Sequence, residues 1–199
     1  MDVEFDAFVS AMRAVTDLPD EQFARARAIF RTVRLDQRAH FALAGQPADK
    51  VGFLIDGLLR TYYLTPDGVE RTKSFREPGQ LVCPYGASLR KQVSDLFIQA
   101  LAPSTMLVAE RSRFDELTLG HPGWGTVLLR LTELHFLEEE GAHRRFLVEN
   151  AETRYVEFLS EQGHLARRLS GRQTASYLGI TPEALSRIRA QRRRDGITG

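Results

Sequence analysis

Cysteine is almost absent from this sequence of 199 residues, which contains only Cys83. A single cysteine excludes an internal disulfide and any multi-cysteine zinc or iron–sulfur site built by one chain. The sequence also lacks an apolar run of the roughly 18 residues that a membrane-spanning helix requires. Its first residues include Asp2, Glu4 and Asp6, whereas a secretory signal peptide begins with basic residues. We therefore expect a soluble, cytoplasmic protein without a membrane partner.

Metal and catalytic signatures are also missing. The five histidines show no metal-ligand spacing, and there is no Ser/His/Asp or Cys/His arrangement and no phosphate-binding glycine-rich loop. An enzyme on a cupin-type barrel would need clustered ligands on strands, but His40 is the only histidine in the strand-like zone. We therefore assign no catalytic residue and no metal ligand, and we expect a protein that is not an enzyme.

Net charge is nearly absent from the whole chain, because 27 basic residues oppose 26 acidic ones. The distribution is uneven, since residues 161–199 contain eight arginines and only three acidic residues. A near-neutral body with a short basic end is typical of a terminal module that binds a polyanion such as DNA. A solvated basic surface without a ligand is the alternative interpretation of the same charges.

Hydrophobic periodicity divides the chain into three zones. Residues 5–31 show two helical patterns. Residues 32–110 alternate short apolar runs with turns about every 8–12 residues, as β-sandwiches and barrels do. From Arg113 onward the period is helical again. The strands predicted in the middle zone span residues 51–55, 58–64, 69–75, 96–101 and 106–110, with the last two expected to pair as a hairpin.

A long helix is predicted from about Trp124 to about Phe146. Its apolar residues form two adjacent stripes, which are Val127, Leu131, Leu134 and Leu137, and Trp124, Leu128, Leu131 and His135. A stripe of this width indicates a helix that buries two sides. We expect one side to pack on the β body and the other on a twin helix, with burial of both sides in one chain as the alternative.

Residues 172–192 have the spacing of a DNA-binding helix-turn-helix, with helices over 172–178 and 182–192. Gly179 supplies the left-handed backbone that ends the first helix. Thr181 and Pro182 are suited to the cap and the first position of the second helix. Ala175 is small where the two helices must approach closely. A small core is expected from Ile180, Leu185 and Ile188.

The outward face of the second helix is predicted to read base edges in double-stranded DNA. Arg187 can donate to guanine O6 and N7, and Glu183 can accept from cytosine N4. Other arginines lie where phosphates are expected. The predicted DNA-binding residues are Arg172, Thr181, Glu183, Ser186, Arg187, Arg189, Arg192 and Arg193.

Several segments resemble the Crp/Fnr family of bacterial transcription regulators. Residues 174–189 are similar to the family's helix-turn-helix, and residues 152–155 to the segment that opens its DNA-binding domain. Residues 55–60, 66–68 and 77–81 are similar to its cyclic-nucleotide-binding-type β-roll. The matching segments occur in the family's order and cover nearly the whole chain.

The resemblance implies an α+β fold in three parts. These are an N-terminal antiparallel, jelly-roll-like β-roll with flanking helices (residues 1–120), a dimerisation helix and hinge (121–148), and a helix-turn-helix domain (149–199). It implies a homodimeric, sequence-specific regulator that reads a pseudo-palindrome with half-sites about 34 Å apart. It also implies RNA polymerase as a further candidate partner.

The ligand cassette departs from the family pattern. Members that bind cyclic AMP have Gly-Glu-Leu early in the cassette and an Arg-Ser or Arg-Thr pair near its end, whereas this chain has Gln80 in the first motif and Leu96-Phe97 near the second. Burying a phosphate without its arginine is costly, so control by cyclic AMP is not expected. No cofactor is assigned, and an unidentified small-molecule effector stays open. The candidate pocket residues are Gly79, Gln80, Leu81, Leu96 and Phe97.

The end of the sequence is a second departure. The family's domain continues into a β-hairpin wing, whereas few residues follow the second helix here. We expect the wing to be absent or reduced. This keeps open the alternative of a ligand-sensing β-roll protein whose C-terminal module contacts proteins instead of DNA.

Overall fold

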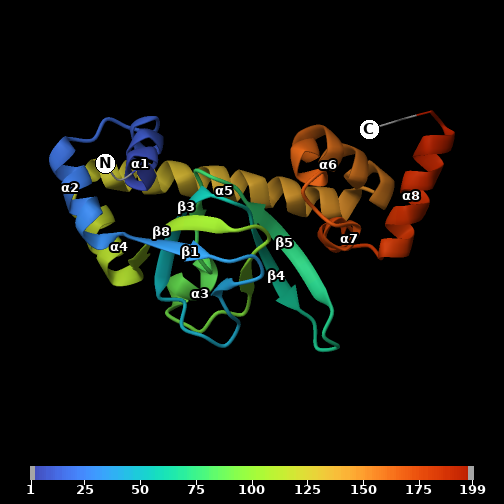
Figure 1. The fold of residues 1–199 in the computed structure, drawn as a ribbon, viewed down its shortest axis with the longest axis horizontal. Helices are drawn as coiled ribbons and strands as arrows, with labels where there is room; N and C mark the ends of the chain where they lie inside the picture. Colours follow the sequence, from blue (N-terminus) through green and yellow to red (C-terminus); the bar gives the residue numbers. More distant parts are fainter. Residues whose placement is uncertain (1–2, 197–199) are drawn as a thin grey trace. The chain divides into compact units, whose positions relative to one another are not determined.

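The computed structural model of this chain describes residues 3–196 (Figure 1). The chain forms two compact units. Unit 1 comprises Met1–Tyr63 and Ser74–His135, and unit 2 comprises Leu64–Lys73 and Phe136–Gly199. The division lies within the long helix, which was predicted to form a segment of its own. Unit 2 also includes residues 64–73, the tip of a β-hairpin in the middle zone.

Four helices contribute apolar side chains to one core cluster of unit 1. They are α1 (Val3–Arg13), α2 (Asp20–Ile29), α4 (Arg111–Leu119) and the first part of α5 (Pro122–Val148). Phe8 lies at the centre, with its ring centroid 5.1 Å from that of Phe53 and 6.1 Å from that of Trp124. These side chains are almost fully buried. The helical patterns predicted for the N-terminal zone are therefore present, and their apolar faces cover one sheet.

The β-roll consists of two four-stranded sheets. The strand order is β1-β8-β3-β6 in the first sheet and β2-β7-β4-β5 in the second. The registered strand pairs are antiparallel, as predicted. The bounds are β1 (Arg31–Leu35), β2 (His40–Ala42), β3 (Lys50–Asp56), β4 (Leu59–Leu64), β5 (Glu70–Arg76), β6 (Leu81–Val82), β7 (Phe97–Ala100) and β8 (Ser104–Glu110).

The central strands β3 and β8 of the first sheet are buried on both faces. Phe53 and Leu107 pack with the helices, whereas their chain neighbours Leu54 and Met106 pack with residues of the second sheet. This alternation follows from the two-residue period of a strand. It explains why β3 and β8 read as nearly continuous apolar runs rather than as half-buried strands.

The predicted hairpin between residues 96–101 and 106–110 is wrong, because β7 and β8 belong to different sheets. Pro103 in the connection has no N–H to donate to a ladder. Instead the connection crosses beside the β3–β4 link, where the Ser104 hydroxyl accepts from the Leu58 amide at 3.3 Å. Gly57 (φ +113°) makes this crossing possible, since a Cβ there would lie 2.2 Å from Ser104 Oγ.

Unit 2 contains the helices of the C-terminal zone. They are the second part of α5, α6 (Ala151–Ala166), α7 (Gly171–Leu178) and α8 (Pro182–Arg194). Helix α6 contains a kink at Gln162 (φ −130°, ψ 32°). A short helix, α3 (Tyr85–Arg90), lies in unit 1 and was not predicted. Within residues 3–196 no strand follows α8, and the last three residues, part of the expected wing stub, lie outside the described range.

The hairpin tip of unit 2 is attached to α7 through one hydroxyl group. Ser176 Oγ accepts hydrogen bonds from the amide and the hydroxyl of Thr72, each at 3.0 Å, and donates to the Glu70 carbonyl at 2.8 Å. Lys73 forms an ion pair with Glu139 of α5 at 3.2 Å. The β4–β5 hairpin therefore contacts both α5 and the first helix of the helix-turn-helix.

Candidate nucleic-acid interface

Helix α7 is closed at both ends by local hydrogen bonds. The Ser170 hydroxyl accepts from the Gln173 amide at 3.2 Å, and the Gln173 side chain accepts from the Ser170 amide at 2.8 Å, which completes a capping box. At the other end Gly179 adopts the left-handed conformation (φ 71°), and its N–H reaches the carbonyls of Ala175 and Ser176. The predicted helix end at Gly179 is confirmed.

Helix α8 begins at the predicted residue. Its N-cap is Thr181, whose hydroxyl accepts from the Ala184 amide at 3.2 Å, and Pro182 occupies the first helical position. Proline is suited to this position because its missing N–H would have no partner within the helix. The start of the candidate recognition helix is thus fixed by its own sequence.

The two helices share a small apolar core with α6. Ala175 is fully buried, and Leu178 and Leu185 are nearly so. Tyr155 and Phe158 of α6 complete the core, and Phe158 contacts Tyr177, whose pKa is raised because its hydroxyl is buried. The roles predicted for Ala175 and Leu185 are confirmed, whereas Ile180 is only partly buried.

The opposite face of α8 is exposed and carries four of the predicted contact residues, which are Thr181, Glu183, Ser186 and Arg187. Hydrogen bonds from its own amide and from the Thr181 hydroxyl lower the pKa of Glu183, and Arg187 adds a smaller favourable charge. Glu183 is therefore an ionised hydrogen-bond acceptor beside Arg187, a cationic donor. An acceptor of this kind can bond to a cytosine edge, and such a donor can bond to a guanine edge.

The predicted arginines differ in their surroundings. Arg172 and Arg193 are exposed, and Arg192 is partly buried. Arg189 instead turns toward α6, where its Nε donates to the Tyr155 hydroxyl at 3.1 Å and its guanidinium lies 5.6 Å from the centre of the Tyr155 ring. No local sequence signal indicates this intramolecular contact, because Tyr155 is distant in sequence from Arg189.

Helix α5 presents a second exposed surface, which is apolar. Trp124 and Val127 are buried, and Leu128 and Leu131 pack against the unit 1 core. The remaining large side chains of this part of the helix are between 57% and 64% exposed, namely Leu129, Leu134, Phe136 and Leu137. One side of the predicted two-sided helix therefore packs within the chain, while Leu134 and Leu137 of the other side are open.

The five predicted ligand-pocket residues lie in different local surroundings. Leu81 packs against the helix-covered cluster of unit 1, whereas Leu96 is buried between the two sheets. Phe97 stacks on Tyr62 with ring centroids 5.0 Å apart, and its chain neighbour Ile98 is the residue of β7 that enters the inter-sheet core. Gly79 adopts φ +91° and donates to the Leu54 carbonyl at 2.8 Å.

Gln80 forms a local hydrogen bond, in which its side-chain oxygen accepts from the Glu77 amide at 2.9 Å.

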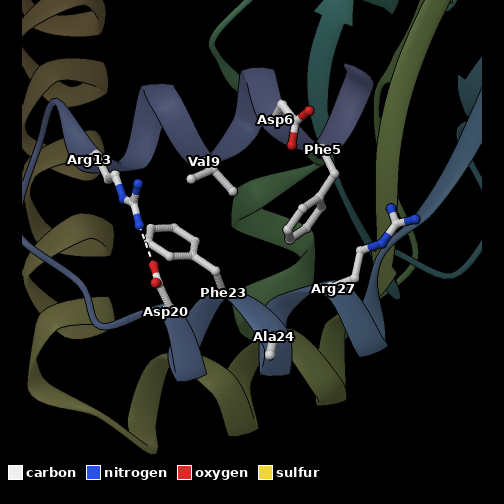
Figure 2. Close-up of a pocket in the computed structure, with 8 residues that line it drawn as sticks. All are labelled: Phe5, Asp6, Val9, Arg13, Asp20, Phe23, Ala24 and Arg27. Carbon is white, nitrogen blue, oxygen red and sulfur yellow. Dashed lines mark hydrogen bonds and ion pairs between the residues drawn. The ribbon is translucent and has the colours of Figure 1, made fainter. Parts of the chain in front are cut away.

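A surface pocket of about 470 Å³ lies elsewhere in unit 1, between α1 and α2 (Figure 2). The rings of Phe5 and Phe23 line it, with Arg27 stacked on the first and Arg13 on the second. None of the five predicted residues lines this pocket.

Among residues 3–196, no three His, Cys, Asp or Glu side chains are placed to hold a metal ion together. In the same part of the chain, no helix combines the length and the apolarity needed to cross a membrane.

A two-sheet antiparallel β-roll, a long helix and a capped helix-turn-helix follow one another along this chain. Comparison with solved structures identifies the fold. FixK2 from Bradyrhizobium japonicum superposes with a TM-score of 0.73 and 22% sequence identity, covering 86% of this chain and 88% of FixK2. A Crp/Fnr family protein from Eubacterium rectale gives a TM-score of 0.74 at 14% identity, covering 90% and 86% of the two chains.

The chain has the fold of the Crp/Fnr regulators, and the resemblance stated from the motifs is confirmed. In sequence, it is 27% identical over 165 residues to the anaerobic regulatory protein of Pasteurella multocida. The match covers 77% of this chain but 60% of that relative, so the chain spans about three fifths of the relative's length. No family model matches the chain.

Proposed function

We propose that this chain is a sequence-specific DNA-binding regulator of transcription of the Crp/Fnr type, acting in the cytoplasm as a homodimer. The observation that carries the proposal is the exposed face of α8, where Glu183, Ser186 and Arg187 point away from a buried core. The caps at Ser170 and Thr181 fix both helices beneath this face. The relatives described above are named as regulators rather than enzymes, which agrees with this proposal.

The open apolar face of α5 supports the homodimer. A large exposed apolar surface on a monomer marks an interaction site, and the same helix from a second copy offers a self-complementary partner across a two-fold axis. The four exposed side chains, Leu129, Leu134, Phe136 and Leu137, then become the dimer contact. A dimer of this kind reads a pseudo-palindrome whose half-sites are about 34 Å apart.

The proposal does not include control by cyclic AMP. Leu96 occupies the region where the family's phosphate-binding arginine is expected, and it is 6% exposed within an apolar cluster. A phosphate placed there would lose its hydration without gaining a partner. The chemical identity of an effector, if the protein uses one, stays open. RNA polymerase is the further candidate partner of the DNA-bound dimer.

Selection of bound fragments from a random DNA library tests the proposal. The purified chain without added ligand is expected to enrich a pseudo-palindromic consensus, with an affinity that falls steeply as salt rises. Binding that is weak and independent of sequence, with or without candidate effectors, would contradict it. That outcome would favour the alternative function, in which the C-terminal module contacts proteins.

A further inference from the structure

We infer that Arg154 is a positioning residue that fixes the turn of the helix-turn-helix to the C-terminal end of α5. Through this contact it sets the separation of the two recognition helices in a dimer. The inference rests on the proposed function, and it assigns a role to the segment 152–155, which that function leaves unexplained. All the residues involved belong to unit 2.

The guanidinium of Arg154 bridges two backbone segments that are far apart in sequence. Its Nη1 donates to the Glu149 carbonyl at 2.5 Å, and its Nη2 donates to the Leu178 carbonyl at 3.0 Å. Glu149 follows the last residue of α5, and Leu178 is the last residue of α7. Carbonyls at helix ends have no partner within the helix, so one planar group satisfies both ends and joins them.

An aromatic ring closes the same contact from the α5 side. Phe146 lies under the guanidinium, with 5.4 Å from the Arg154 Cζ atom to the ring centre. The ring also lies against the turn, because a Cβ at Gly179 would be 2.9 Å from Phe146 Cε2. Gly179 thus serves two needs: it accepts the left-handed conformation, and it leaves room for this ring.

A second ionic contact holds α5 beside α6. Arg145 lies 3.8 Å from a carboxylate oxygen of Glu157 and 3.6 Å from one of Glu161. Both ion pairs are partly exposed and therefore contribute only modestly to stability. They restrict the sliding of the two helices, whereas Arg154 fixes the turn itself. Helix α5 also contacts α7 through Arg145 and Tyr177 and through the β4–β5 hairpin. Its contact with the turn itself is made by Arg154 and Phe146.

The turn is the point from which such a displacement reaches α8. Only Ile180 and Thr181 separate Gly179 from Pro182, where α8 begins, and both helices are capped. Two rigid helices joined by a short turn move together, so the position of α8 follows that of Leu178 and Gly179. In a dimer held together by α5, the separation of the two α8 helices then depends on the Arg154 bridge.

A purely structural role is the competing explanation. Arg154 has an Nε atom that is buried and has no hydrogen-bond partner among residues 3–196. If Arg154 served only to fill space, an apolar side chain of similar length could replace it with little loss in the free energy of unfolding. The two explanations differ in what they predict for the geometry between α5 and α8 in a folded variant.

The first test measures spacing preference on DNA. Arg154→Lys keeps the charge but cannot hold two carbonyls with one planar fork. We expect the ratio of affinities between the preferred half-site spacing and a spacing one base pair longer to fall about tenfold, while base preference within a half-site is unchanged. Arg144→Lys is the matched control, because Arg144 contacts the Glu149 side chain at 3.2 Å instead of the turn.

The second test does not use DNA. Nitroxide spin labels are attached to the variant His143→Cys/Arg194→Cys in a Cys83→Ser background. The labelled protein is diluted with unlabelled protein, and pulsed electron paramagnetic resonance then measures the distance between α5 and α8. We expect a single narrow distance distribution that broadens in Arg154→Lys but not in Arg144→Lys. Phe146→Leu is a second variant with little risk of misfolding, since Phe146 is 61% exposed, and it should broaden the distribution in the same way.

The two tests separate this inference from the proposed function. If the wild-type chain selects no palindrome, the proposed function fails, and the distance measurement still decides the role of Arg154. If the wild-type chain selects a palindrome but the variants retain both its spacing preference and the narrow distance distribution, the positioning role is overturned while the regulator function stands.

Discussion

Arg189 of α8 donates a hydrogen bond from Nε to the hydroxyl of Tyr155, 3.1 Å away on α6. Three charged residues of this helix therefore differ in their surroundings. Arg187 and Glu183 are exposed on the outer face, whereas Arg189 holds the helix to its support. An arginine-rich helix is therefore not a uniform basic surface, and the role of each arginine follows from its direction.

Removing the Tyr155 hydroxyl should destabilise unit 2 without changing which bases are read. Tyr155→Phe leaves the Arg189 guanidinium over the ring but removes its acceptor. We expect a loss of about 1–2 kcal/mol in the free energy of unfolding, measured by urea denaturation. The selected DNA consensus should be that of the wild-type protein. A changed consensus with unaltered stability would show that Arg189 contacts bases instead.

Glu183 should titrate below its usual pKa of 4.5, because its own amide and the Thr181 hydroxyl hydrogen-bond to the carboxylate. A lowered folded-state pKa stabilises the fold at pH values above the unfolded-state value, and this contribution is lost as the pH falls through the folded-state pKa. Carboxyl-carbon NMR measures the midpoint directly. Thr181→Ala should raise it toward the usual value, and an unchanged midpoint in that variant would refute the assigned cause.

A charge on the open face of α5 should separate the dimer. Phe136 is 64% exposed, so Phe136→Glu should not unfold the chain. A carboxylate opposite its twin in an apolar interface is strongly unfavourable, and sedimentation should show a monomer with weakened palindrome binding. Leu119→Glu is the matched control, since Leu119 of α4 is 88% exposed and lies outside this face. A dimer that tolerates the change at Phe136 would place the interface elsewhere.

Arg172 should contribute affinity but not specificity. It is exposed near the start of α7, where the proposed function expects a DNA phosphate. Arg172→Ala should weaken binding equally for all sequences and reduce the salt slope by about 0.9 for each phosphate that is no longer neutralised. Arg113→Ala changes the charge by the same amount in unit 1 and should leave the slope unaltered. A weakening confined to one base position would assign Arg172 a different role.

The helix-turn-helix could be predicted from the sequence because its signals are local. Ser170, Gly179 and Thr181 each fix a helix end through bonds to residues close in sequence. The structure then placed Glu183 and Arg187 on the exposed face, as the helical period requires.

The sheet partners could not be predicted, because they depend on contacts that are distant in sequence. The chain passes from one sheet to the other between β7 and β8, where Ser104 lies close to Gly57. No turn motif in the sequence indicates this close approach. The different surroundings of the predicted pocket residues have a related reason. Leu81 and Leu96 are close to one cassette in sequence, but they pack into different clusters of unit 1.

A double-mutant binding cycle determines whether Arg187 contacts a base. The wild-type chain and Arg187→Ala are titrated against the selected palindrome and against a palindrome in which its strongest guanine is replaced in both half-sites. We expect each single change to cost about 1–3 kcal/mol per contact. The change in DNA should then cost the variant little more. If the two losses simply add, Arg187 does not read that base, and the account of α8 as the recognition helix is contradicted.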